Sequence, residues 1–327
     1  MTEGLRLDGV DGATPQGFLA ALGVLDVVTR KSNGQIPKLW WRQSGTWVPT
    51  LSFDFTLSEL ADLIVRDRDD ALLRPVLRFR YPKLDKNGVK SVGCLTPPVA
   101  VLRAWLEARM AHRDWLSLRE MAALMSELGV DSIKPEKQFS ASQFAELGIE
   151  SDVTSTPRLA CLQTAFDFTS RNAQFLDQLR QIGGSLNAAD VSAQLTNRSS
   201  GAQGMRTMDW AYGSDAPGAL YNAKQDFQRT ALDWLAWRGL TWLPVFGKGD
   251  KAQTTSCTGR RKQGVFSWCV WGPPCTLRVA ASLLASGLWR LPRVQEREAV
   301  GIQAVFECQL TKAADGYGGV FSPASFV

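Results

Sequence analysis

The stretch TPQGFLAALGVLDVVTRK, residues 14–31, carries the clearest structural signal of the chain. Thr14 is a favoured N-cap residue, and Pro15 follows it at the first helical position, where its missing N–H has no consequence. The apolar residues that recur at helical spacing are Phe18, Leu22, Leu25 and Val28. We therefore expect a helix over residues 15–30 with one apolar face, ended by Asn33-Gly34.

Short strands are expected on both sides of this helix. Leu5-Arg6-Leu7 alternates apolar and polar residues, which suits a strand. Residues 38–53, KLWWRQSGTWVPTLSF, are typical of two or three short strands around a turn at Ser44-Gly45. Thr56 with Glu59 three positions later forms a capping box, which predicts a helix over residues 57–68.

The rest of the chain mixes helical and strand patterns irregularly, so we predict an α+β fold with an antiparallel sheet. Further helices are expected at 97–112, 117–128, 171–182 (closed by Gly183-Gly184), 226–239 and 277–286, and further strands at 159–168, 241–246, 265–271 and 300–311. Residues 129–157 are rich in Ser, Thr, Asp and Pro. They divide the chain into regions 1–150 and 151–327, although one integrated domain fits as well.

The composition argues against most kinds of catalysis. His112 is the single histidine, so histidine-based metal nucleases, zincins and Ser–His or Cys–His nucleophile pairs do not fit. The six cysteines are scattered without zinc-knuckle spacing, and we expect them to be reduced thiols in the cytoplasm. The sequence contains no apolar run of membrane-spanning length, so no membrane association is expected. We predict a binding protein, not an enzyme, without metal or cofactor.

Two local patterns qualify that prediction. Gly9-Val10-Asp11-Gly12 lies between a strand and a helix, where a phosphate loop would lie, but no phosphate-binding motif is present and we interpret it as a turn. Asp67, Asp69 and Asp70 are close in sequence and leave a carboxylate-dependent magnesium nuclease open. Because they alternate with Arg66 and Arg68, we interpret them as a solvated helix end.

Two basic stretches indicate that the expected partner is a polyanion such as a nucleic acid. Residues 66–90 contain eight basic and four acidic residues, with Arg78 and Arg80 alternating with Phe79 and Tyr81. Residues 247–263 contain five basic residues and one acidic residue, punctuated by glycines. The second stretch suits a projecting hairpin that grips a phosphate backbone. The candidate nucleic-acid-binding residues are Lys248, Lys251, Arg260, Arg261, Lys262, Arg78, Arg80 and Lys83.

The N-terminal segment resembles CRISPR-associated proteins of type I effector systems, particularly the type I-G group. The matching residues are Gly9, Pro15, Gly17, Phe18, Leu19, Ala20, Ala21, Leu22, Gly23 and Leu25, followed by Trp41, Gly45, Trp47 and Pro49. Weaker similarity covers Trp210, Tyr212 and Asp215, the helix at 231–239, the strand at 265–271 and the final VFSPA motif. The matched positions look structural, so no functional residue is carried over individually.

The resemblance implies a non-catalytic subunit of an RNA-guided, Cascade-type surveillance complex in antiviral defence, similar to its large or accessory subunits. Such a subunit contacts guide RNA and target DNA, binds other effector subunits, and recruits a separate helicase-nuclease. One alternative is a protein-only adaptor that docks effector subunits through tryptophan-rich surfaces. A second alternative is the carboxylate-dependent magnesium nuclease.

Overall fold

The computed structural model describes residues 4–32, 35–52, 54–72, 81–85, 88–92, 175–201, 229–243, 245–248, 251–258, 264–312, 319–322 and 324–327. Within these ranges the chain is an α+β protein with antiparallel sheets, as the sequence predicts. The helices expected at 97–112 and 117–128, the strand at 159–168, the linker at 129–157 and the boundary at residue 150 lie outside the described residues.

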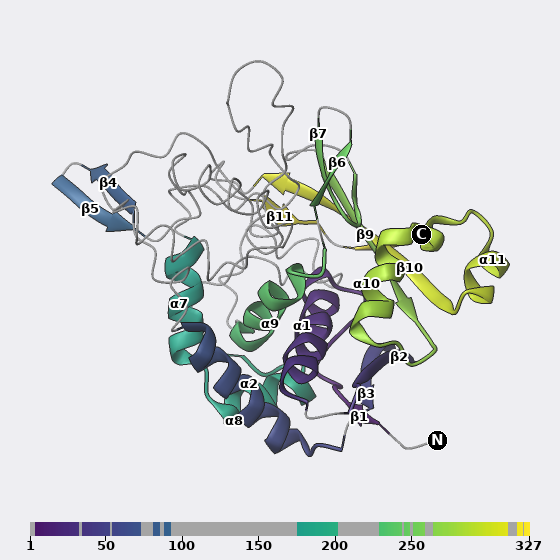
Figure 1. Ribbon diagram of the computed structural model, residues 1–327, viewed down its shortest axis with the longest axis horizontal. Helices are drawn as coiled ribbons and strands as arrows, with labels where there is room; N and C mark the ends of the chain where they lie inside the picture. The colour runs from purple at the N-terminus through teal and green to yellow at the C-terminus, as the bar shows by residue number, and fades with distance from the viewer. Residues whose placement is uncertain are drawn as a thin grey trace, which may run out of the picture.

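Helix α1 (Pro15–Lys31) is the centre of the fold (Figure 1). Its N-terminus has the predicted cap, because the Thr14 hydroxyl accepts a hydrogen bond of 3.0 Å from the backbone N–H of Gly17. Every residue from Pro15 to Val28 is buried, so the helix is covered on all sides and not along a single face. Figure 1 shows helices α2, α7, α8 and α9 on one side of α1 and the two main sheets on the other.

The closest neighbour of α1 is α9 (Thr230–Leu240), and glycines line the contact between them. A Cβ atom added to Gly23 would lie 1.9 Å from the carbonyl oxygen of Leu235, and one added to Gly239 would lie 2.0 Å from that of Leu19. The two helix backbones therefore touch directly, which only glycine permits at these positions.

The first sheet has the order β1-β3-β2 and consists of β1 (Leu5–Arg6), β2 (Lys38–Ser44) and β3 (Thr46–Ser52). The predicted turn is present, with Gly45 at φ +71° between β2 and β3. Helix α2 (Leu57–Leu72) then begins with the predicted capping box: the Thr56 N–H donates to Glu59 Oε2 at 2.8 Å. The pKa of Glu59 is lowered because its carboxylate accepts from the backbone and the hydroxyl of Thr56.

The second sheet contains β8 (Cys257–Thr258), β9 (Gly264–Trp271), β10 (Ile302–Lys312) and β11 (Gly319–Phe321) in that spatial order, and β12 (Ser325–Phe326) also pairs with β10. The two sheets meet at a bridge, where Leu39 and Cys275 exchange hydrogen bonds of 2.8 and 2.9 Å. Phe18 packs between the rings of Trp41, Trp268 and Trp271, at centroid distances of 5.9 to 6.4 Å.

Three helices complete the region after β9, and two precede α9. Helix α10 (Leu277–Ser286), the short 3-10 helix η2 (Leu288–Arg290) and α11 (Val294–Ala299) follow β9. Helix α7 (Phe175–Ser185) continues through Gly183-Gly184, so the prediction that this glycine pair closes the helix is wrong. Helix α8 (Ala188–Thr196), capped by Asn187, was not predicted.

The described tryptophans serve the core. Those that are buried are Trp40, Trp41, Trp234, Trp268, Trp271 and Trp289, and those that are half-buried are Trp47, Trp237 and Trp242. Residues from the expected regions 1–150 and 151–327 belong to the same hydrophobic cluster, with α1 against α9 at its centre. None of the tryptophans in the described ranges stands exposed as a docking residue.

Candidate nucleic-acid interface

A β-hairpin occupies the start of the second basic stretch. Strands β6 (Val245–Lys248) and β7 (Lys251–Thr254) pair with each other in a separate two-stranded sheet, which stands at the top of Figure 1. In this register Lys248 lies directly opposite Lys251. The candidates Arg260, Arg261 and Lys262 lie outside the described residues, in the connection between β8 and β9.

A second hairpin occupies part of the first basic stretch. Strands β4 (Tyr81–Asp85) and β5 (Gly88–Val92) also form a two-stranded sheet of their own, and Lys83 lies directly opposite Lys90. Arg78 and Arg80 lie outside the described residues. The structure thus brings Lys248 together with Lys251, and Lys83 together with Lys90, in two different hairpins.

A cluster of four charged side chains lies where α9 meets α1 and α2, shortly before β6 in the chain. The Trp242 indole N–H, just before β6, donates to Asp26 of α1 at 3.1 Å. Arg30 contacts Asp26 at 2.8 Å and Asp67 at 3.1 Å, and Arg238 of α9 lies 3.6 Å from Asp26 and 3.5 Å from Asp67. Two buried carboxylates are therefore balanced by the buried Arg238 and the partly exposed Arg30, and these ion pairs fix α9 against α1 and α2.

This arrangement corrects one sequence interpretation. Asp67 was expected at a solvated helix end, but its side chain is 1% exposed and faces Arg30 and Arg238. Asp69 is exposed and pairs with Arg68 at 2.6 Å. In the described part of the chain, no three histidine, cysteine or acidic side chains are grouped so that they could hold a metal ion.

Backbone N–H groups of the turn at residues 9–12 donate hydrogen bonds to carbonyls elsewhere in the protein. The Gly9 N–H donates to the carbonyl of Leu195 at 2.8 Å, and the Gly12 N–H donates to that of Trp47 at 2.7 Å. A phosphate would have to displace both bonds, so the interpretation of this segment as a turn is confirmed. A Cβ on Gly9 would lie 2.3 Å from the Gln194 carbonyl oxygen, which explains the glycine by packing.

Arg229 secures the adjacent helix end. Its guanidinium donates to the carbonyls of Gln194 and Asn197, and the backbone N–H of Ala231 donates to the Gln194 side chain at 2.9 Å. Burial, with repulsion from Arg198, lowers the pKa of Arg229 to about 10. The group therefore stays charged at neutral pH and holds α8 against α9.

The thiols in the described ranges suit packing and not nucleophilic chemistry. Cys257, Cys269, Cys275 and Cys308 form no disulfide with one another. Burial raises the pKa of each of these thiols, most strongly for Cys257, Cys269 and Cys308. A thiol is a poor nucleophile because only the thiolate attacks. Cys94 and Cys161 lie outside the described residues.

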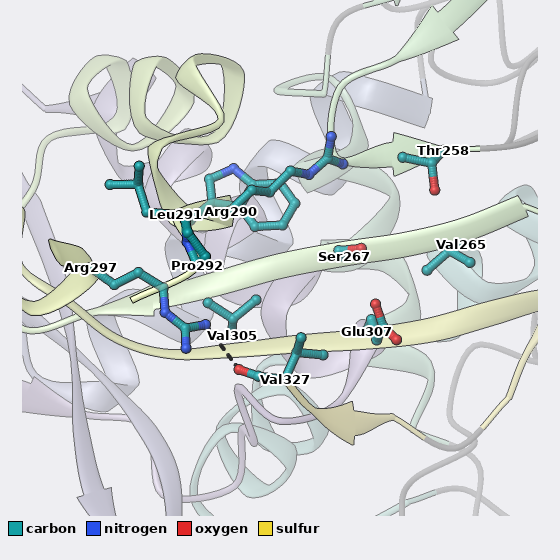
Figure 2. Close-up of a pocket in the computed structure, with 11 residues that line it drawn as sticks. Thr258, Val265, Ser267, Arg290, Leu291, Pro292, Arg297, Val305, Glu307 and Val327 are labelled. Atoms are coloured by element: carbon teal, nitrogen blue, oxygen red, sulfur yellow. Dashed lines mark hydrogen bonds between the residues drawn. The ribbon is translucent and has the colours of Figure 1, made fainter. Parts of the chain in front are cut away.

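A pocket of about 460 Å³ lies on the face of the second sheet that points away from α1 (Figure 2). Its floor comes from Thr258 of β8, Val265 and Ser267 of β9, and Val305 and Glu307 of β10. Its walls come from the segment Trp289–Pro292, from Arg297 and from Val327. Arg297 closes one end by donating to the Val327 carbonyl at 2.9 Å. We call this the C-terminal pocket.

Three charged side chains line this pocket, Arg290, Arg297 and Glu307, and none of them was predicted as a site residue. The Arg290 guanidinium stacks on the indole of Trp289, 4.4 Å from its centroid, and extends toward Thr258 (Figure 2). Glu307 lies on β10 directly opposite Ser267 of β9. Sequence reasoning could not find this pair, because the residues are far apart in the chain and neither belongs to a basic stretch or a motif.

Two further findings concern membrane segments and relatives of the chain. Within the described ranges, no helix combines the length and the apolar composition that a transmembrane segment needs. Comparison with known proteins finds no protein-family model and no curated protein that matches this chain.

Proposed function

We propose that the protein is a non-catalytic nucleic-acid-binding subunit of an RNA-guided, Cascade-type effector complex that acts in the cytoplasm. The observation that carries nucleic-acid binding is the cross-strand pairing of lysines in two separate hairpins, Lys248 with Lys251 and Lys83 with Lys90. The resemblance of the N-terminal segment supplies the kind of complex.

The lysine pairs destabilise each hairpin when no anionic ligand is bound. Directly opposite residues of an antiparallel pair have Cβ atoms about 5 Å apart, and like charges there destabilise the pair. A two-stranded hairpin is marginally stable in water even without that repulsion. A polyanion would remove the repulsion by neutralising both charges, and it would gain affinity from counterion release.

Free cysteines, and the absence of a metal-holding group of side chains among the described residues, support a subunit that leaves metal-dependent cleavage to another protein. Guide RNA and target DNA are the proposed ligands, and other effector subunits are the proposed protein partners. The remaining candidate residues are proposed to bind nucleic acid as well: Arg78 and Arg80 precede β4 in the chain, and Arg260, Arg261 and Lys262 precede β9.

Charge reversal in the second basic stretch tests the proposal. The triple variant Arg260→Glu, Arg261→Glu, Lys262→Glu is compared with a control triple variant of exposed residues, Lys38→Glu, Arg42→Glu, Arg278→Glu. We expect the first to lose binding of fluorescein-labelled single-stranded RNA and DNA in anisotropy titrations, and the control to retain it. Equal affinities for both variants and the parent would contradict the assignment.

A further inference from the structure

We propose that the C-terminal pocket binds one unstacked guanine nucleotide of a single-stranded nucleic acid, with the phosphate at Arg290 and the base edge at Glu307. This inference rests on the proposed function, and it names the base that the protein reads. It is carried by the size of the pocket, by the opposite charges of Arg290 and Glu307, and by the connection of the pocket to the β6–β7 hairpin.

The first step concerns Arg290. Stacking on Trp289 holds its guanidinium flat and leaves the N–H edges available. Among the described residues no carboxylate lies within ion-pair distance of it. A guanidinium that stacks on an indole at the edge of a pocket, with no ion pair to the described residues, is suited to bidentate binding of a phosphate, because its donors are already oriented.

The second step concerns Glu307. Its side chain is half-buried in the middle of β10 and makes no hydrogen bond or ion pair with the residues that the structure describes. The carboxylate has two acceptor oxygens and repels anions, so it selects a ligand group with adjacent donors. Guanine is the one common base that presents two neighbouring donors, N1–H and the N2 amino group, on its Watson–Crick edge.

The third step is the arrangement of these groups. Thr258, Ser267 and Glu307 lie on three successive strands, β8, β9 and β10, so Thr258 and Glu307 are two strand spacings apart across the sheet and two residues apart along it, roughly 12 Å in all. Arg290 extends toward the Thr258 side, as Figure 2 shows. A nucleotide likewise carries its phosphate and its base edge at opposite ends. Ser267 lies on the strand between Thr258 and Glu307, Val265 and Val305 add apolar surface to the floor, and the volume of about 460 Å³ is in the range of small-ligand sites.

The fourth step is the connection to the proposed interface. The β6–β7 hairpin leads through Thr255-Ser256 directly into β8, whose last residue, Thr258, lines the pocket. A strand of nucleic acid bound along the hairpin could therefore place one nucleotide in the pocket without a break in contact.

The test uses two fluorescein-labelled RNA heptamers, UUUGUUU and UUUUUUU, titrated against the full chain. A bidentate base contact discriminates by 1–3 kcal/mol, so we expect the guanine heptamer to bind about tenfold more tightly. Glu307→Gln should abolish this preference, so that the two heptamers bind this variant with equal affinity. Arg290→Ala should weaken the binding of both heptamers. It should also make the negative slope of log affinity against log salt shallower by about 0.7.

Matched controls are Glu298→Gln and Arg278→Ala, exposed residues of α11 and α10 outside the pocket, which should change neither quantity. Binding of both heptamers without a guanine preference, or a preference that survives Glu307→Gln, would overturn the pocket assignment and leave the proposed function standing. Failure of every oligonucleotide to bind would overturn both.

Discussion

The contact between α1 and α9 makes a quantitative prediction for Gly23→Ala. The added methyl carbon would lie 1.9 Å from the Leu235 carbonyl oxygen. An ordinary contact is about 3.5 Å, so the two backbones would have to separate by roughly 1.6 Å. Because the neighbour is backbone and not a flexible side chain, we take the upper part of the overpacking range, about 3 kcal/mol. Alanine recovers about 1 kcal/mol of helix propensity, which leaves a net loss of about 2 kcal/mol.

Gly184→Ala is the matched control, since Gly184 is also helical but a Cβ there would meet no atom within 4 Å. This variant should gain between zero and about 1 kcal/mol, because only the propensity changes. Equilibrium urea unfolding, followed by tryptophan fluorescence, measures both variants; the expected signature is a lower midpoint for Gly23→Ala at an unchanged m value. Equal stability of the two variants would refute the close backbone contact.

Three further perturbations test other parts of the fold. Ser256→Gly should stabilise the protein by about 1 kcal/mol, since Ser256 has φ +64° and its buried hydroxyl makes no hydrogen bond with the residues that the structure describes; an unchanged urea midpoint would argue against this strain. Arg238→Met should lower the free energy of unfolding by about 3–5 kcal/mol, because Asp26 and Asp67 are left with one cation. Adding Asp67→Asn should recover part of this loss. Additive losses in the double-mutant cycle would contradict the four-charge cluster. Burial raises the pKa of Cys269 above that of the unfolded thiol, so the stabilisation by the buried thiol is complete below about pH 9 and is lost as the pH rises further. The free energy of unfolding should therefore fall less steeply above pH 9 in Cys269→Ala than in the parent. Equal pH dependence of the two proteins would contradict this prediction.

Local signals in the sequence were sufficient where the structure is decided locally. The Thr14 cap and the Thr56–Glu59 capping box each occur within four residues, and both helices begin where these patterns predict. Gly183-Gly184 misled the prediction because tertiary contacts override helix propensity there: Ile182 is buried, and Arg68 donates to the Gly183 carbonyl at 3.0 Å.

Long-range features could not be predicted in the same way. Asp67 alternates with arginines in sequence, yet it is buried because Arg30 and Arg238 reach it from two other helices. The C-terminal pocket depends on η2 lying over three strands, and nothing in the local sequence around Arg290 or Glu307 indicates that placement. The basic hairpin was more accessible to prediction, since glycines and lysines mark it directly in the sequence.

The salt dependence of nucleic-acid binding tests the central claim most directly. The double variant Lys248→Gln, Lys251→Gln is compared with Lys38→Gln, Arg278→Gln, which removes the same charge from exposed positions elsewhere. For single-stranded RNA, loss of two phosphate contacts should make the negative slope of log affinity against log salt shallower by about 1.4 in the hairpin variant. The control variant should keep the parent slope. Identical slopes for the parent, the hairpin variant and the control would contradict the proposal that the β6–β7 hairpin binds the phosphate backbone.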